Sequence, residues 1–225
     1  MRNAPSILSE ADRRTVAGAI EAAERRMGAE LVVVVASRSA RYLRADDLTG
    51  LAAGMVLATA ANVASMRPAA SGDWSWVVPA PVGLIGTLAL VVAGWLAGVW
   101  ACARWPRLSA WARGRAEMQE QVRRRGSDCF VNLRVRNTRG GTGVLIYVSL
   151  LERLVWVVAD DAVAAKVGPE TWHGMKDRIV QRAAQGALSA GLVEAIGLAA
   201  DVLAPHFPPE PDRADELPNT VHLLG

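Results

Sequence analysis

One uncharged stretch constrains the fold of this chain more than any other feature. Residues 76–103, WVVPAPVGLIGTLALVVAGWLAGVWACA, carry no charged side chain. They outnumber the roughly 20 residues that a membrane-spanning helix needs. Pro79 and Pro81 fall near the start, where the missing backbone N–H of a proline costs least. A buried core helix is the alternative, but such helices are usually shorter. The sequence therefore predicts a transmembrane helix over about residues 82–103.

Another uncharged run lies earlier in the chain. Residues 50–66, GLAAGMVLATAANVASM, are rich in alanine and include Asn62, so a core helix is a stronger alternative here. Of the 225 residues, 52% are hydrophobic, which is a high share for a soluble protein. Because this excess lies between about residues 48 and 103, we expect the two runs to form an inserted two-helix transmembrane hairpin.

Arginines flank the expected hairpin on both outer sides. The short connection RPAASGDWS, in contrast, carries one arginine and one aspartate. The positive-inside rule then places both termini in the cytoplasm and the connection outside. We therefore expect an integral membrane protein whose remaining domain is cytoplasmic. The flanking arginines are Arg38, Arg41, Arg44, Arg104, Arg107, Arg113 and Arg115.

Two further features fit a hairpin in a bilayer. Four tryptophans fall where an interfacial aromatic belt would lie, and glycines four residues apart would let the two helices approach closely. The tryptophans are Trp74, Trp76, Trp100 and Trp105, and the glycine pairs are Gly50/Gly54 and Gly94/Gly98. The basic segment RWPRLSAWARGR could serve nucleic acid, but beside a membrane helix lipid head groups are the simpler partner. We expect the lipid bilayer and another membrane protein as partners, and no nucleic acid.

The residues on either side of the hairpin form one expected α/β domain that the hairpin interrupts. Ser9 and Asp12 give a capping pattern for the start of a helix whose end Gly28 can cap. The segment AELVVVVAS follows as a strand that is apolar on both faces, which is typical of a central strand. This strand lacks a partner before the hairpin, so its partners must follow it.

The second half supplies those partners. We expect a helix over residues 109–126, a connection over 129–143, two strands over 144–150 and 154–159 in a tight antiparallel pair, and two further helices. The expected parts of the chain are residues 1–45, with the N-terminal helix and first strand; 46–104, the transmembrane hairpin; 105–208, the remainder of the domain; and 209–225, an extended C-terminal tail. Within that tail, ELPNTVHLL can dock as an extended segment.

Two adjacent carboxylates, Asp160 and Asp161, end the second of these strands. Open α/β sheets usually build their sites at the carboxyl ends of strands. Carboxylates there can hold a hard cation such as Ca²⁺ or Mg²⁺, with backbone carbonyls and water completing the shell. The alternative is that a strand-end aspartate caps the next helix or makes a turn.

The two aspartates are expected to differ. Adjacent residues that leave a strand point to opposite faces. We expect Asp161 to start the next helix, where the helix dipole favours its charge. Asp160 has no such local reason for its charge, so it is the better ligand candidate and is expected to face a cleft at the carboxyl edge of the sheet.

Common phosphatase signatures are absent from the sequence. A Cys-x5-Arg loop that starts at Cys129 would need arginine at position 135, which is valine. The aspartates are adjacent rather than spaced as Asp-x-Asp, none of the three histidines lies in Arg-His-Gly, and no GxxxxGK[ST] loop occurs. The remaining route to phosphate hydrolysis is metal-assisted, with a cation that neutralises phosphate charge and activates water.

Several segments together resemble the TPM domain family, named for a thylakoid lumen protein, a photosystem II repair protein and a nematode receptor-associated protein. The segments are TGVLIYVSLLERLVWVVADD, Trp172, GLVEAI and HFPPEPDRADELPN. The likeness is to the bacterial membrane-anchored branch, and it covers most of residues 143–219 and, more weakly, 9–37. Asp215 departs from the asparagine that this branch usually has before ELPN.

The resemblance implies an α/β/α sandwich. The expected fold is therefore a three-layer sandwich with a small mixed sheet, interrupted by the transmembrane hairpin. For some plant members the resemblance also implies acid phosphatase activity and divalent cation binding, whereas other members look like assembly or accessory factors. Glu152 and Arg153 match the family's ER pair, for which a local ion pair or turn contact is the simpler reading.

These observations predict an accessory or interaction module of the bacterial inner membrane. The alternative function is a divalent-metal-dependent, acid-phosphatase-like phosphohydrolase that uses Ca²⁺ or Mg²⁺. No catalytic residue is assigned from the sequence.

Overall fold

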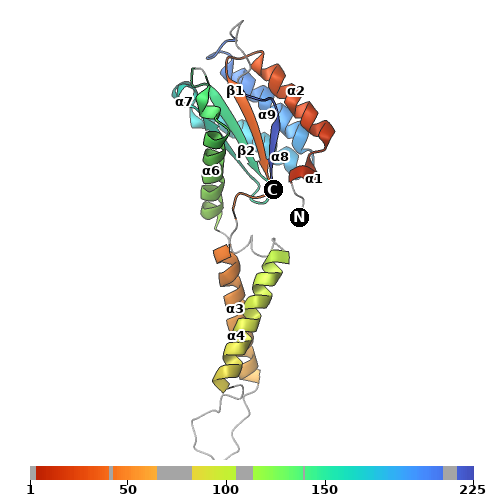
Figure 1. Cartoon of the computed structure of the whole chain (residues 1–225), viewed down its shortest axis with the longest axis vertical. Coiled ribbons are helices and arrows are strands. Elements are labelled where there is room, and N and C mark those ends of the chain that lie inside the picture. The colour runs from red at the N-terminus through yellow and green to blue at the C-terminus, as the bar shows by residue number, and fades with distance from the viewer. Residues whose placement is uncertain (1–3, 41–42, 65–82, 105–113, 139, 210–216) are drawn as a thin grey trace, which may run out of the picture. The chain divides into compact units, whose positions relative to one another are not determined.

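The computed structural model describes residues 4–40, 43–64, 83–104, 114–138, 140–209 and 217–225. The chain divides into two compact units (Figure 1). We call Met1–Ala40 with Ala116–Gly225 the sheet domain and Arg41–Arg115 the helical hairpin. The elements of the sheet domain are α1 (Ala4–Ile7), α2 (Glu10–Glu24), β1 (Glu30–Ala36), α6 (Arg115–Asn132), the 3₁₀ turn η1 (Val135–Asn137), β2 (Gly143–Ser149), β3 (Leu154–Ala159), α7 (Asp161–Lys166), the 3₁₀ turn η2 (Pro169–Trp172), α8 (His173–Ala184), α9 (Leu188–Leu203) and β4 (Val221–Leu224). The hairpin contains α3 (Leu43–Ala64) and α4 (Gly83–Arg104).

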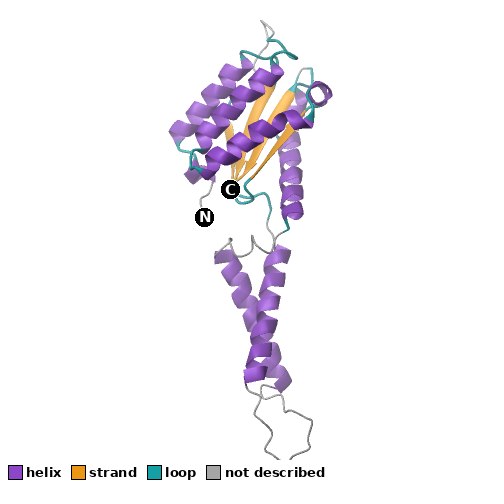
Figure 2. Cartoon of the chain, turned by 180° about the vertical axis from the view of Figure 1, so that it is seen from behind, coloured by secondary structure: helices purple, strands orange, loops and turns teal. Residues whose placement is uncertain are grey.

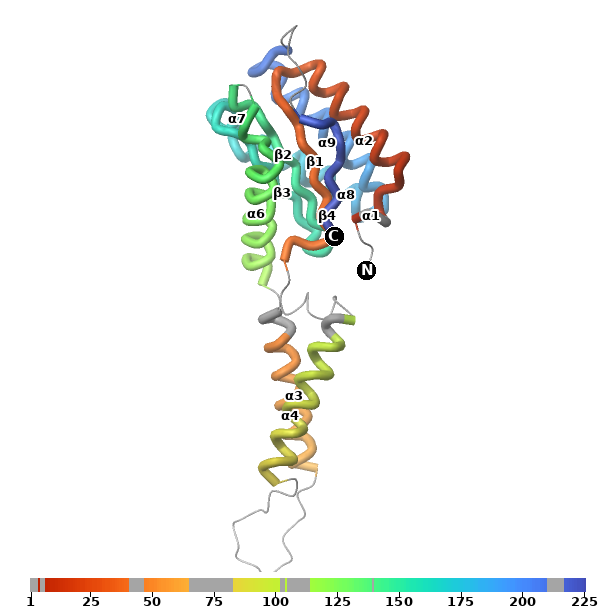
Figure 3. Tube along the Cα trace, viewed as in Figure 1, coloured from red at the N-terminus to blue at the C-terminus, as the bar shows by residue number. Residues whose placement is uncertain are grey.

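A four-stranded mixed sheet in the order β3-β2-β1-β4 forms the centre of the sheet domain. β1 pairs in parallel with β2 on one side and with β4 on the other. Figure 3 shows this arrangement as an orange strand between a green and a blue one. β3 pairs antiparallel with β2. The predicted α/β class and the predicted antiparallel strand pair are both confirmed.

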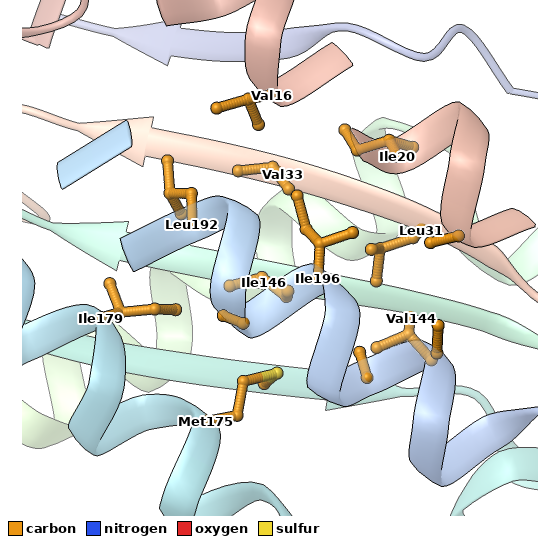
Figure 4. Packing of buried hydrophobic residues seen from close by; sticks show 14 of the residues in the cluster. Val16, Ile20, Leu31, Val33, Val144, Ile146, Met175, Ile179, Leu192 and Ile196 are labelled. Carbon is orange, nitrogen blue, oxygen red and sulfur yellow. The ribbon is translucent and has the colours of Figure 1, made fainter. Parts of the chain in front are cut away.

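Helices cover both faces of the sheet (Figure 2), and the residues of β1 that follow Glu30 are all apolar. All seven of its residues are buried, as the sequence predicts for a central strand. On one face, alternate residues of β1 and β2 pack against apolar stripes of α2, α8 and α9 (Figure 4). The labelled members are Val16, Ile20, Leu31, Val33, Val144, Ile146, Met175, Ile179, Leu192 and Ile196.

On the opposite face, α6 packs against the sheet. Its buried positions are Val122, Gly126, Cys129 and Phe130, which form one helical stripe. The predicted connection over residues 129–143 is partly wrong, because this stripe continues the helix to Asn132. The start of the predicted helix, residues 109–113, lies outside the described residues.

The predicted start of the helix before β1, which is α2, is confirmed. Ser9 is the N-cap of α2, and its Oγ accepts a hydrogen bond from the Asp12 N–H at 3.1 Å. The Asp12 carboxylate accepts one from the Ser9 N–H at 3.0 Å. The hydrogen bond from the Ser9 hydroxyl to the Asp12 carboxylate lowers the pKa of Asp12. Arg25, rather than Gly28, is the C-cap residue.

The C-terminal segment docks as an extended strand, as expected, and joins the sheet. Val221–Leu224 pairs in parallel with the second half of β1, from Val33 to Ala36. This pairing makes β4 an edge strand of the same sheet that contains the N-terminal strand. Residues 210–216 of the predicted tail lie outside the described residues.

The two hairpin helices pack through the predicted glycine pairs. A Cβ added at Gly54 would overlap the carbonyl oxygen of Val91, and one added at Gly94 would overlap the backbone of Gly54. A Cβ at Gly98 would crowd the backbone of Gly50 in the same way. Such close approach of two helix backbones requires small residues at these positions.

Both hairpin helices are long and apolar enough to cross a membrane. The qualifying segments are Asp47–Ala64, with 18 residues, and Gly83–Ala101, with 19 residues. Only 17% of the first segment and 6% of the second are buried. Most of their apolar side chains therefore remain uncovered by protein within the hairpin. The predicted ends of the two spans at Met66 and Val82 lie outside the described residues.

Candidate functional site

The two predicted pairs of site residues lie at opposite ends of the sheet. Because β3 runs antiparallel to β2, its last residue, Ala159, pairs with Val144 near the start of β2. Asp160 follows directly, so it lies at the amino ends of the parallel strands, and its predicted place at the carboxyl edge is wrong. Glu152 and Arg153 lie in the β2–β3 turn at the carboxyl edge, about 20 Å away along β2.

Asp160 is held by local bonds. It is the N-cap of α7, and its Oδ1 accepts a hydrogen bond from the Asp161 N–H at 2.8 Å. Its backbone N–H donates to the Gly143 carbonyl at 2.9 Å, and its carbonyl accepts from the Ala164 N–H at 2.8 Å. The expectation that Asp160 has no local reason for its charge is wrong, because its carboxylate caps α7.

The other carboxylate oxygen of Asp160, Oδ2, is not used in these bonds. Asp160 is 6% exposed, and its Oδ2 is buried with no hydrogen-bond partner among the residues that the structure describes. Gly140 and Gly141 have φ of 81° and 62°, which favour glycine. A Cβ at Gly141 would lie 3.5 Å from this oxygen, so the loop passes close to it. A buried carboxylate oxygen without a donor is costly.

Asp161 starts α7, as predicted, and its side chain is 93% exposed. Its carboxylate lies 3.6 Å from Arg136 Nη2. The two aspartates therefore occupy different environments and do not converge. Within the described parts of the chain, no group of three or more His, Cys, Asp or Glu side chains could hold a metal ion. Ca²⁺ takes about six to eight oxygens, so Asp160 Oδ2 would have to act with backbone oxygens and water.

At the carboxyl edge, Glu152 is part of a buried polar network. Glu152 is 7% exposed, and its Oε1 accepts a hydrogen bond from the Ser39 N–H at 3.1 Å. Its Oε2 accepts from the Ser149 hydroxyl. The Ser39 hydroxyl donates to Ser149 Oγ at 2.8 Å and shares a hydrogen bond with the Tyr147 hydroxyl at 3.1 Å. The expected turn contact is present, and it extends to the exit of β1.

This hydrogen-bond network holds the end of β1 and the β2–β3 turn together. Burial raises the pKa of Tyr147 to about 12, although the hydrogen bond with Ser39 acts in the opposite direction. Tyr147 therefore stays protonated at neutral pH and can donate. Backbone bonds hold the same edge, with the Leu150 N–H on the Ala36 carbonyl at 3.0 Å and the Leu151 N–H on the Ser37 carbonyl at 3.1 Å.

Arg153 has an unusual backbone conformation. Its φ of 54° lies in the left-handed region, which is uncommon for residues other than glycine. Its side chain is exposed. Such positions often occur where a site requires a particular side chain. Arg153 is therefore a candidate ligand-binding residue at this edge. Glu152, in contrast, has a structural role.

Sequence reasoning missed Ser39, Tyr147 and Ser149. Tyr147 and Ser149 are two residues apart on β2, so they share a face of the sheet. Ser149 could have been noticed from the sequence, because it is a polar residue at the end of an apolar strand. Ser39 had none, because its bond to Glu152 joins residues 113 positions apart.

Comparisons with known proteins support the fold and assign no site. No protein-family profile matches the chain, and no curated protein matches it. It is similar to the NMR structure of the BA42 protein from the psychrophilic bacterium Bizionia argentinensis sp. nov., with 20% sequence identity and a TM-score of 0.58. The match covers 99% of this chain and 99% of that one.

Proposed function

We propose that the chain is a membrane-anchored TPM-like domain protein of the bacterial inner membrane, which acts as an accessory or interaction module. In this proposal the fold is a three-layer α/β/α sandwich on the cytoplasmic side, interrupted by a transmembrane hairpin. The exposed apolar surface of α3 and α4 is the observation that carries the proposal.

That surface is extensive on α4. Leu84 and Ile85 are 76% and 84% exposed, and Trp100 is also exposed. Each square ångström of apolar surface left in water costs about 25 cal/mol. A lipid bilayer would cover this surface, and uncharged helices of this length match its hydrocarbon core.

The internal packing of the hairpin supports the same environment. The glycine pairs bring the two backbones together and direct the larger apolar side chains outward. Asn62, a polar residue of α3, donates from Nδ2 to Thr87 Oγ1 of α4 at 3.2 Å. A polar side chain that bonds across a helix pair is tolerated in a bilayer.

The arginine asymmetry supports the proposed orientation. The outer flanks of the hairpin are arginine-rich, whereas the connection between its helices carries one arginine and one aspartate. By the positive-inside rule, the sheet domain then lies in the cytoplasm.

The carboxyl edge of the sheet is the surface that we propose for binding a membrane partner. β1 ends at this edge, and the helical hairpin begins at Arg41, directly after Ala40. After the hairpin, α6 runs antiparallel to β2, because Gly126 lies against Tyr147 while Val135 contacts Gly143 at the start of β2. Both connections therefore leave the sheet domain from its carboxyl edge. Ligands of α/β proteins usually bind at this edge, and in this chain it adjoins the anchor in sequence.

A metal-dependent phosphohydrolase is the second candidate. The buried Oδ2 of Asp160 favours it, because this oxygen has no hydrogen-bond partner among the described residues. The first candidate is preferred because Asp160 lies at the amino ends of the parallel strands and Asp161 does not join it.

Two measurements on the full-length chain test the proposed function. After expression in a bacterium, the protein should stay in the membrane pellet on alkaline carbonate extraction, and its release would contradict anchoring. In detergent, p-nitrophenyl phosphate hydrolysis with Mg²⁺, Ca²⁺ or a chelator should show no metal dependence.

Two variants separate the candidates in that assay. Asp160→Ala removes the buried carboxylate, and Asp161→Ala is the matched control on the adjacent exposed residue. Metal-dependent hydrolysis by the natural chain that survives in Asp161→Ala and disappears in Asp160→Ala would establish the phosphohydrolase instead.

A further inference from the structure

We propose that Arg38, Arg125 and Arg153 form a binding site for the head groups of anionic phospholipids at the carboxyl edge of the sheet domain. This inference rests on the proposed membrane anchoring. It adds a second attachment to the membrane, made by the folded domain itself.

These three arginines differ from most others in the sheet domain. All three residues are exposed, and among the described residues no ion pair or hydrogen bond of their guanidinium groups is found. Arg134, which follows α6 and precedes η1, is another exposed arginine of this kind in the described part of the sheet domain. The paired arginines are Arg13 and Arg14 with Glu10, Arg25 with Glu21, Arg26 with Asp201, Arg123 and Arg124 with Glu120, Arg136 with Asp161, and Arg178 and Arg182 with Glu194.

Three elements bring the site together. Arg38 follows β1 and Arg153 lies in the β2–β3 turn, and the Leu151 N–H bond to the Ser37 carbonyl at 3.1 Å holds these two loops side by side. Arg125 lies on α6 next to Gly126, where an added Cβ would lie 3.5 Å from the Tyr147 side chain. The Tyr147 hydroxyl in turn bonds the Ser39 hydroxyl at 3.1 Å.

The backbone under the site is already ordered. Ser39 and the β2–β3 turn are joined through Glu152 and Ser149. Ser37 is tied to the last strand, because its N–H donates to the Leu224 carbonyl at 2.8 Å. A ligand that binds the three guanidinium groups would therefore order side chains and little backbone, which lowers the entropic cost of binding.

The chemistry of the site fits phosphate groups. Guanidinium groups bind phosphate oxygens through paired hydrogen bonds. Arg41 and Arg44 follow Arg38 immediately before the apolar run of α3. Basic residues beside a membrane helix attract anionic lipids, and each one strengthens association by about fivefold. This position favours a lipid head group over a free phosphate.

Hydrogen exchange on the full-length chain in lipid nanodiscs tests the proposal. One set of discs contains phosphatidylcholine alone, and the other adds phosphatidylglycerol. We expect amides of residues 37–40 and 150–154 to exchange several-fold more slowly with phosphatidylglycerol, and high salt to abolish the difference. Equal exchange in the two lipids would overturn the proposal.

A matched pair of triple variants identifies the residues. Arg38→Gln with Arg125→Gln and Arg153→Gln should lose the slowing. The control, Arg14→Gln with Arg25→Gln and Arg178→Gln, removes the same charge from α2 and α8 and should keep it. The proposal fails if the first variant keeps the slowing, or if the control loses it as well.

Two further readouts separate the lipid site from a free-anion site and from the anchoring itself. Inorganic phosphate added to phosphatidylcholine discs should leave exchange unchanged, and equal slowing by phosphate would assign the site to a free anion. Exchange of the α4 amides in the same discs reports insertion. Protected α4 amides without a phosphatidylglycerol effect would refute the lipid site alone, whereas unprotected α4 amides would refute the anchoring.

Discussion

The helices α9 and α4 are both strongly apolar, and they have opposite environments. α9 buries eight of its 16 residues within the sheet domain. In the 19-residue apolar segment of α4, only 6% is buried. The apolar residues of α9 form a stripe, and Asp201 and Glu194 lie off that stripe, whereas α4 is apolar on all sides. Apolar content alone therefore does not determine where a helix belongs; the distribution of apolar residues around it does.

Glycines show the same contrast. Gly18 in α2 has nothing within 4 Å of an added Cβ, so it is free of packing demands. Gly54 in α3 faces the backbone of α4. Gly54 is therefore required for the close packing of α3 on α4, whereas Gly18 can be replaced by a residue with a side chain.

The largest expected effect comes from a core truncation. Leu192→Ala removes a fully buried side chain of α9 and should lower the free energy of unfolding by about 2–5 kcal/mol. Leu84→Ala is the matched change on the exposed surface of α4 and should leave the unfolding of the sheet domain unchanged. Denaturant unfolding in detergent, followed by tryptophan fluorescence, measures both. Equal effects would remove the distinction between the two helices.

A charge placed on each helix gives the next effect. Leu88→Arg on α4 should oppose membrane insertion by about 2.5–3.5 kcal/mol, because the new charge would face hydrocarbon. Leu198→Arg on α9 places the same charge at a partly exposed position of the sheet domain and should be tolerated. Membrane-fraction yield compares them. If Leu88→Arg inserts normally, α4 does not face lipid.

A glycine pair gives a smaller effect. Gly54→Val should separate α3 from α4 at a cost of about 1–3 kcal/mol, because its side chain would overlap the Val91 backbone. Gly18→Ala should instead stabilise the sheet domain by about 0.5–1 kcal/mol. A disulfide between cysteines introduced on the two helices reports the hairpin spacing. Unchanged cross-linking in Gly54→Val would refute the glycine contact.

The smallest effect concerns pH and the edge strand β4. Burial lowers the pKa of His222 in the folded chain. The unfolded chain therefore binds the proton more readily, and stability falls as the pH drops below the ordinary histidine value of about 6.5. The protection of the β4 amides, measured relative to their intrinsic exchange rate at each pH, should fall over this range in the natural chain and not in His222→Gln. The same pH dependence in both chains would exclude His222 as its source.

Local patterns predicted most elements of the sheet domain. The Ser9 cap, the strand at β1 and the strand at β3 each carry a signal within a few residues. Long-range pairing was less accessible. The sequence indicated that β1 needs partner strands but did not predict which residues pair, because β2 and β4 follow the hairpin in the chain.

The candidate site was harder to predict than the fold. Asp160 and Asp161 follow a strand, and the error was to treat every strand end as the carboxyl edge. In an antiparallel pair, the end of one strand adjoins the start of its neighbour. Ser39 and the three unpaired arginines come from separate segments, so only the folded chain brings them to one edge.

The topology of the hairpin tests the proposed anchoring most directly. Paired reporters, one active only in the cytoplasm and one only outside, can be fused at Ser71 and after Gly225 of the full-length chain. The proposed topology predicts that the fusion at Ser71 reports outside and the C-terminal fusion reports cytoplasm. If both fusions report the same side, α3 and α4 do not span the membrane as a hairpin.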